Sequence, residues 1–100
     1  MRPDSGAVDL QPVRWDRATA GAGRDLDIHY TITGRAECHT LGRVDVAETA
    51  QSVTVTLRIG RLPTANCGGP QPMIAMTGVT TVTLGAPLGT RAVRDGAATG

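Results

Sequence analysis

The chain has 100 residues and a formal net charge of +1 at pH 7, and it contains one Trp, one Tyr and no Phe. This length corresponds to a single domain that can bury a core without a metal or a partner. All ten basic residues are Arg, and they are interspersed with acidic residues rather than gathered in a block. Nucleic acid is therefore not an expected partner, because binding it needs clustered cations and stacking aromatics.

Composition also predicts the domain limits and the compartment. Residues 1–7 and 95–100 are expected to be flexible ends of a single domain spanning residues 8–94. No apolar run approaches the roughly 18 residues of a membrane-spanning helix, so no transmembrane segment is expected. Residues 1–6 lack the apolar core and the cleavage site of a signal peptide. We expect a secreted or cell-envelope protein given as a mature form or a piece, or a cytoplasmic one if Met1 is the native start.

The first third of the chain shows strand-like alternation. Residues 8–15 alternate loosely, and Pro12 confines this strand to a sheet edge or a bulge. Residues 17–24 (RATAGAGR) are expected to form a loop. Residues 25–33 predict a half-buried strand, because their apolar side chains share one face, namely Leu26, Ile28, Tyr30 and Ile32.

The middle of the chain predicts a hairpin followed by a long connection. Residues 43–48 and 52–59 alternate between branched apolar residues and polar ones, which is typical of strands. The short stretch 49–51 between them predicts the turn. Residues 60–72 (GRLPTANCGGPQP) form the longest irregular segment.

The last third of the chain completes an all-β pattern. Residues 74–84 are rich in Thr and Val and predict one long strand, or two strands broken near Gly78. Residues 86–89 predict a turn and residues 90–94 a closing strand. Six to seven short strands separated by turn signals predict an antiparallel β-sandwich, either Ig-like or a small barrel.

Cys38 and Cys67 are the only cysteines, and a disulfide between them would tie the middle of the fold together. Two other chemistries use the same residues. With His29 and His39 they could supply a Cys2His2 metal site, although adjacent Cys38 and His39 would diverge on an extended strand. A reduced cysteine beside His39 could be a reactive thiol, and both could be free and inert. We expect a disulfide and no metal.

Two segments are candidate binding surfaces. Trp15 stands between arginines, with Arg14 before it, and an exposed Trp there would be an interaction hot spot. In a chain without Phe, the same Trp could instead fill the core. The second candidate is the start of the long connection, namely Arg61, Leu62, Pro63 and Thr64. A disulfide-tethered loop here could enter a hydrolase cleft in extended conformation, or the cysteine could simply pin a long connection.

Polar residues on the strands allow weaker hypotheses. His29 lies on the polar face of its strand and could act as a base or a pH sensor. Thr-x-Thr pairs at residues 31/33, 54/56 and 81/83 would form a hydroxyl array if one sheet carried all three. Threonine is also a common solvent-facing residue of antiparallel sheets.

No motif in the sequence specifies catalysis. There is no G-x-S-x-G, H-E-x-x-H, phosphate-binding loop or dinucleotide fingerprint. No catalytic residue and no cofactor are therefore expected. The favoured function is a non-enzymatic extracytoplasmic binding domain for an unknown protein or envelope ligand. The alternatives are an inhibitor-type loop domain acting on an extracellular hydrolase, and a small isomerase or cyclase with a cavity lined by His29, Tyr30 and Met76.

Residues 25–96 resemble a group of small uncharacterised actinobacterial proteins, many of them exported or lipid-anchored. The resemblance rests on V-x-V-x-E-T-A before V-T-V-T-L, at residues 44–57, and on PLG-x-R-x-V-x-DG at residues 87–96. It implies an exported β-fold with Cys38 bonded to Cys67, and it implies no activity. The oligomeric state does not follow from the sequence.

Overall fold

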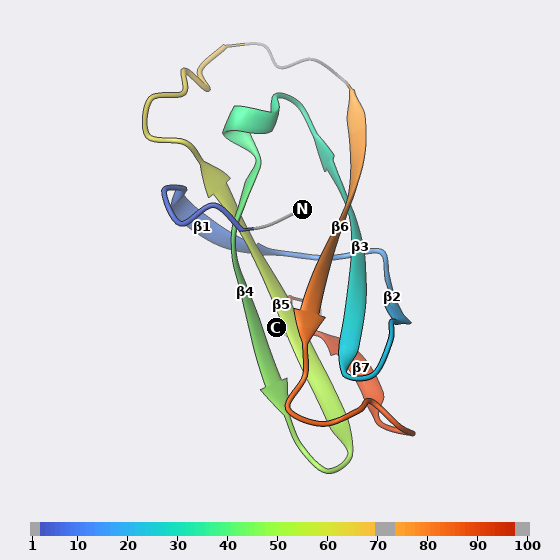
Figure 1. Cartoon of the computed structure of the whole chain (residues 1–100). Helices are drawn as coiled ribbons and strands as arrows, with labels where there is room; N and C mark the ends of the chain where they lie inside the picture. The colour runs from blue at the N-terminus through green and yellow to red at the C-terminus, as the bar shows by residue number, and fades with distance from the viewer. Residues whose placement is uncertain (1–2, 70–73, 98–100) are drawn as a thin grey trace.

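The computed structural model describes residues 3–69 and 74–97, which fold into seven strands and one short 3-10 helix, η1 (Figure 1). The elements in chain order are β1 (Val8–Val13), β2 (Arg17–Ala20), β3 (Asp25–Thr33), η1 (Ala36–Cys38), β4 (Thr40–Glu48), β5 (Ser52–Arg61), β6 (Ala75–Thr83) and β7 (Ala92–Asp95). The predicted all-β class is confirmed. Among the described residues, no helix is long and apolar enough to span a bilayer.

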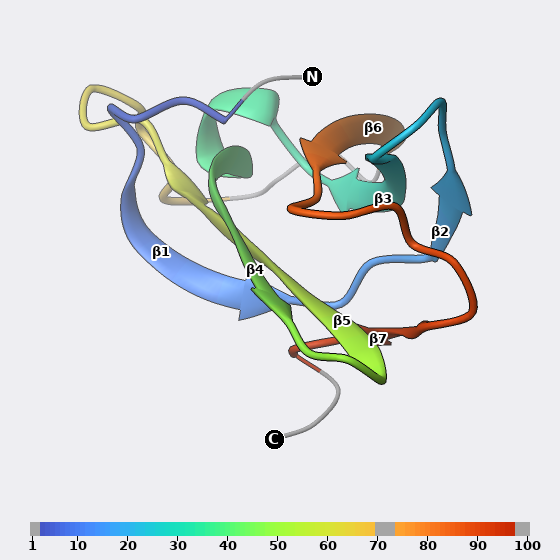
Figure 2. The ribbon, with the colours of Figure 1, turned by 60° about the horizontal axis from the view of Figure 1, so that its bottom comes forward.

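The strands form two sheets that pack face to face as a sandwich. One sheet has the order β1-β5-β4, and the other has the order β2-β3-β6. Strand β7 joins the first sheet by pairing with β5 in parallel over Ser52–Val55, next to the segment of β5 that pairs with β1. Figure 2 shows β4 and β5 in one layer and β3 and β6 in the other. Every other strand pair is antiparallel.

The core lies between the two central strands, β3 and β5. Every second residue is buried from Leu26 to Tyr30 in β3 and from Val53 to Ile59 in β5, as the alternation in sequence predicts, and Ile32 is half-buried. Nine apolar side chains make up the core: Leu26, Ile28, Tyr30, Leu41, Val53, Val55, Leu57, Ile59 and Leu84. At about 1.5–3 kcal/mol for each large side chain removed from water, this burial is the main force that holds the sheets together.

Two expectations for individual strands are wrong. The segment expected to be a loop at residues 17–24 begins with β2, which pairs with β3 from Arg17–His29 to Ala20–Leu26. Half-buried Ala18 packs against the core there, and the turn shrinks to the few residues before β3. The suggested break near Gly78 is also absent, because β6 pairs with β3 without interruption.

Other strand predictions agree with the structure. Pro12 lies in β1, an edge strand that pairs only with β5 and carries a register shift between Val8 and Gln11. The turn at residues 49–51 joins β4 to β5, and the Thr49 N–H donates to the Ser52 carbonyl across it at 2.8 Å. The hydrophobic alternation was therefore sufficient to predict this hairpin.

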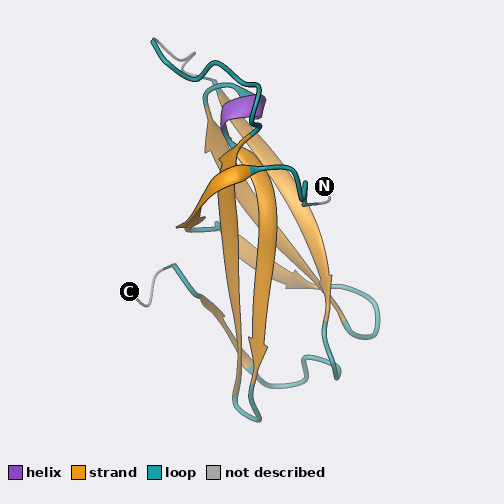
Figure 3. Cartoon of the chain, turned by 90° about the vertical axis from the view of Figure 1, so that its left-hand side faces the viewer, coloured by secondary structure: helices purple, strands orange, loops and turns teal. Residues whose placement is uncertain are grey.

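Two of the connections that cross between the sheets lie at the same end of the sandwich. One carries η1 between β3 and β4, and the other runs from β5 to β6 (Figure 3). The predicted disulfide is confirmed: Cys38 and Cys67 are bonded, with their Cα atoms 5.7 Å apart. The bond joins these two connections at one end of the sandwich and does not cross the middle of the core.

Candidate functional site

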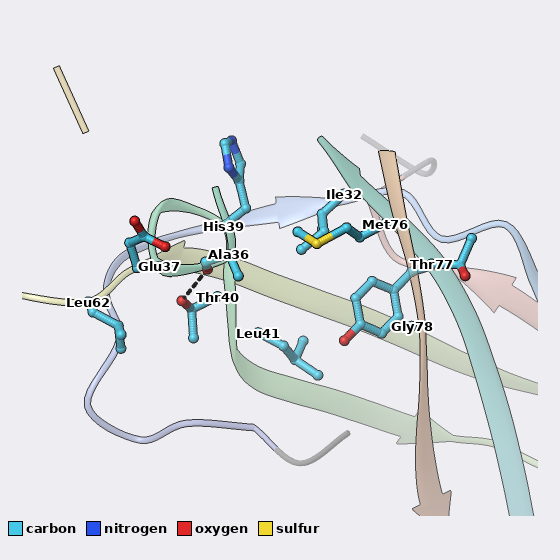
Figure 4. Close-up of a pocket in the computed structure, with 11 residues that line it drawn as sticks. Ile32, Ala36, Glu37, His39, Thr40, Leu41, Leu62, Met76, Thr77 and Gly78 are labelled. Atoms are coloured by element: carbon cyan, nitrogen blue, oxygen red, sulfur yellow. Dashed lines mark hydrogen bonds between the residues drawn. The ribbon is translucent and has the colours of Figure 1, made fainter. Parts of the chain in front are cut away.

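A cavity of about 520 Å³ opens between the sheets at the end that carries η1 (Figure 4). Seven of its lining residues are apolar or lack a side chain: Tyr30, Ile32, Ala36, Leu41, Leu62, Met76 and Gly78. The polar lining residues are Glu37, His39, Thr40 and Thr77. Figure 4 shows Ile32, Met76 and Gly78 on one side, with Glu37, His39 and Leu62 on the other.

The sheet-side wall is built by one cross-strand pair. Tyr30 of β3 faces Gly78 of β6, and the Tyr30 side chain is 1% exposed. A Cβ atom at position 78 would lie 2.8 Å from Tyr30 Cζ and 2.9 Å from its hydroxyl oxygen. Glycine therefore lets the ring pack closely against the β6 backbone. Burial raises the pKa of the Tyr30 hydroxyl, so this wall remains neutral at physiological pH.

The opposite wall is built by the connection from β3 to β4, which carries η1, and the connection from β5 to β6. The Leu62 N–H donates to the Glu37 carbonyl at 2.9 Å, and the Thr40 hydroxyl donates to the Ala36 carbonyl at 2.8 Å. Arg35 Nη1 donates to the Asn66 carbonyl at 3.2 Å. Together with the disulfide, the hydrogen bonds of Leu62 and Arg35 hold η1 against the segment after β5, and that of Thr40 closes the turn between η1 and β4. The bonded cysteines therefore position a wall of the cavity.

Three of the four polar lining residues, Glu37, His39 and Thr40, lie toward η1, whereas Thr77 lies on β6 beside Met76 and Gly78. His39 Nδ1 lies 3.2 Å from the Arg35 carbonyl oxygen. Within the described ranges, no three His, Cys, Asp or Glu side chains come together as a metal site. Both cysteines are oxidised and supply no thiolate. The arrangement is suited to enclosing an apolar molecule and to hydrogen bonding at one side of it.

The candidate binding residues Trp15 and Arg14 lie elsewhere in the fold. Trp15 packs against the core; its indole N–H donates to the Val55 carbonyl at 2.9 Å, and its backbone N–H donates to Asp95 Oδ2 at 2.8 Å. Arg14 beside it is exposed. Both polar contacts of Trp15 thus join the segment after β1 to β5 and β7.

The second group of candidate residues lies at the far end of β5. Arg61 Nε pairs with Asp9 Oδ2 at 2.9 Å, and Leu62 lines the cavity. Pro63 and Thr64 are exposed. Arg61 lies six positions after Val55 along β5, a span of about 20 Å, so this group and Trp15 do not form one surface. Of the predicted loop, residues 70–72 lie outside the described residues.

The outer faces of the sheets carry the remaining polar candidates. His29 faces away from the cavity, because it precedes inward-facing Tyr30 on the same strand, and its Nε2 lies 2.9 Å from the Thr19 hydroxyl. Thr81 and Thr83 donate to Asp27 and Asp25 at 2.6 and 3.0 Å. The pair at residues 54/56 belongs to the other sheet. The three Thr-x-Thr pairs therefore do not share one surface.

Sequence reasoning named only part of this cavity. Tyr30 and Met76 were expected to line one, and both do, whereas His29 does not. Ile32 carried a usable signal, because it continues the apolar face of its strand. Leu41 did not, because it is out of phase with Val44 and Val46 and a register shift separates it from them. Comparison with family models, with curated proteins and with solved structures finds no match to this chain. The function must therefore be argued from the geometry of the chain itself.

Proposed function

We propose that this chain is a non-enzymatic extracytoplasmic binding domain that holds a small apolar molecule between its two sheets. The observation that carries the proposal is the 520 Å³ cavity with mostly apolar walls. Ligand sites in proteins typically enclose about 300–1,000 Å³ and are lined mainly by apolar side chains, with a few polar groups that fix orientation.

The size of the cavity limits the ligand and its affinity. At the packing density of protein interiors, 520 Å³ accommodates on the order of 20 non-hydrogen atoms. A ligand of that size that buries about 250 Å² of apolar surface gains roughly 6 kcal/mol at about 25 cal/mol per Å². This corresponds to a Kd of tens of micromolar. Ordering costs lower the net gain, and hydrogen bonds at the η1 side raise it.

The side chains around the cavity favour binding over catalysis. Its buried residues Tyr30 and Leu41 and its half-buried Ile32 and Met76 offer an apolar surface. A cyclase or isomerase needs a base within hydrogen-bond reach of the reacting atom. His29 faces the other side of the sheet, and the basic groups that do line the cavity, Glu37 and His39, lie across it from the apolar side chains of Ile32 and Met76. The Tyr30 hydroxyl, whose pKa burial raises, is a poor base.

The disulfide supports an extracytoplasmic location. Disulfides persist in oxidising compartments and are rare in reducing ones, and the bond here ties down a wall of the proposed site. We also propose that the chain is related to the small exported actinobacterial proteins that it resembles. The inhibitor-type alternative has less support, because the Ala65 N–H donates to the Leu62 carbonyl at 3.0 Å. That turn folds residues 62–65 back, whereas a cleft-filling loop is extended.

Nuclear magnetic resonance titration with neutral 1-naphthalenemethanol tests the proposal. We expect saturable shifts of the methyl signals of Ile32, Leu41 and Met76. Ala36→Phe places a ring at an exposed cavity position and should weaken binding at least fivefold. Ala47→Phe adds the same ring at an exposed position near the other end of β4 and should leave binding unchanged. Absence of shifts, or equal effects of both variants, would overturn the proposal.

A further inference from the structure

We infer that the ligand of this cavity carries a hydrogen-bond-donating cation, an ammonium group attached to the apolar body. The inference rests on the proposed binding function and assigns the chemical class of the ligand. It depends on the hydrogen-bonding capacity of three side chains at the η1 side of the cavity: Glu37, His39 and Thr40.

The contact of His39 with the backbone fixes its tautomer. Its Nδ1 lies 3.2 Å from the Arg35 carbonyl oxygen, and a carbonyl oxygen only accepts hydrogen bonds. Nδ1 therefore carries the proton. In the neutral ring, Nε2 then has a lone pair and is an acceptor.

Thr40 contributes a second acceptor to the same side. Its hydroxyl proton is used in the 2.8 Å hydrogen bond to the Ala36 carbonyl, and the Oγ1 lone pairs remain for a donor from elsewhere. A ligand hydroxyl or ammonium can donate to this oxygen. A ligand carbonyl or carboxylate cannot, because it has no proton to donate.

Glu37 is the charged side chain that lines the cavity. Within the described parts of the chain, no hydrogen bond or ion pair of its carboxylate is found, and the residue is exposed. Two neighbouring arginines are already engaged: Arg35 donates to the Asn66 carbonyl at 3.2 Å, and Arg61 pairs with Asp9. Arg35 keeps its positive charge in a hydrogen bond to a neutral carbonyl, so the η1 side offers one carboxylate beside two further acceptors, which can receive the hydrogen bonds of an ammonium group.

The two sides of the cavity suit different parts of the ligand. Apolar Ile32 and Met76 lie across the cavity from Glu37 and His39 (Figure 4). An apolar body against the sheet side would direct a head group toward the acceptors. A molecule with a flat apolar body and one primary ammonium group satisfies both sides.

Three probes with one shared ring test the inference: 1-naphthylmethylamine as the cation, 1-naphthalenemethanol as the neutral donor, and 1-naphthaleneacetate, a carboxylate, as the anion. Titrations of the oxidised chain at low salt should rank the cation tightest and the anion weakest. We expect about a three- to fivefold advantage of the cation over the alcohol, the range for an exposed ion pair. The advantage should shrink in 0.5 M salt because of screening.

Two matched variants assign the charge effect to one side chain. Glu37→Gln should remove the advantage of the cation and leave the affinity for the alcohol nearly unchanged. Asp25→Asn removes one negative charge at the opposite end of β3 and should preserve the ranking. Equal affinities of the three probes, or preference for the anion, would overturn the inference while the binding function stands. If none of the probes binds, the proposed function itself fails.

Discussion

Removing the disulfide tests how the end of the sandwich is held together. In the double variant Cys38→Ser, Cys67→Ser, the loss in free energy of unfolding depends on the 29 residues of sequence that separate the two cysteines. The loop-closure relation gives a loss of about 3.6 kcal/mol at 25 °C. Neither cysteine belongs to the apolar core. The loss should therefore come mainly from greater freedom of the unfolded chain and only slightly from lost packing.

This magnitude is large for a domain of 100 residues, whose stability is typically about 5–15 kcal/mol. The midpoint of thermal unfolding should fall by about 15–30 °C. Urea unfolding at 25 °C followed by Trp15 fluorescence measures the change, because Trp15 contacts β5 far from the bond. The wild-type chain treated with excess dithiothreitol is the control, and it should match the serine variant.

A loss below about 1 kcal/mol would refute the reasoning. It would mean that the unfolded chain already keeps these segments together, or that strain in the folded state offsets the entropy term. A loss well above 5 kcal/mol would also contradict it, since the bond would then be supporting core packing that the structure does not show. The 1-naphthalenemethanol titration should weaken in the serine variant, because η1 and Leu62 lose their covalent link.

Three further predictions concern single side chains. Gly78→Ala should destabilise the fold by about 1–3 kcal/mol through overpacking against Tyr30. Gly68→Ala, whose Cβ would lie 3.7 Å from Asn66 Oδ1 in ordinary van der Waals contact, should have little effect on the urea midpoint. Arg91→Lys should lower the free energy of unfolding in urea by about 1–2 kcal/mol. The guanidinium of Arg91 donates to Glu48 and to the carbonyls of Ala86, Pro87 and Leu88, and a single ammonium cannot replace all four contacts. The control Arg94→Lys, at an exposed position, should leave the stability unchanged. Arg58, with Arg43, lowers the pKa of Asp45. The contribution of these ion pairs to the stability of the fold is therefore present above pH about 4 and is lost as the pH falls through the depressed pKa. Asp45→Asn should cost up to about 1 kcal/mol at pH 7 after allowance for solvent screening, and the difference from wild type should vanish once the pH is below the depressed pKa. A difference that grew at low pH would contradict the assignment.

Local patterns predicted the central strands, and tertiary pairing determined the rest. The alternation in β3 and β5 specifies which face of each strand points into the core, because each strand buries only one of its two faces. The four residues of β2 have no such signal, and their strand character comes from pairing with β3. The parallel pairing of β7 likewise depends on a free edge of β5 that β1 leaves open.

The cavity was harder to predict than the strands. The packing of Tyr30 against Gly78 depends on the register of β3 and β6, which no local pattern specifies. Leu62 reaches the cavity because its N–H donates to the carbonyl of Glu37, a residue of η1 in the connection between β3 and β4. A glycine within a Thr- and Val-rich strand suggested a break. In the structure it marks a close approach of an aromatic ring.

The two ends of the sandwich differ in how the space between the sheets is filled. At the far end, Glu48 accepts from the Gly85 N–H at 2.8 Å, which joins β4 to the segment after β6, and buried Leu84 fills the interior. At the η1 end, the facing positions include Ala36, Thr40 and Gly78, and the chain has no Phe to place there.

A ligand would therefore supply contacts that the side chains at the η1 end lack, and its binding should stabilise the fold by mass action. At 100 times its Kd, 1-naphthylmethylamine should add about 2.7 kcal/mol and raise the midpoint of thermal unfolding by about 10–20 °C. Ala36→Phe should show a smaller rise at the same probe concentration. If the probe bound by titration but left the midpoint unchanged, it would bind folded and unfolded chains alike, and the cavity between the sheets would not be its site.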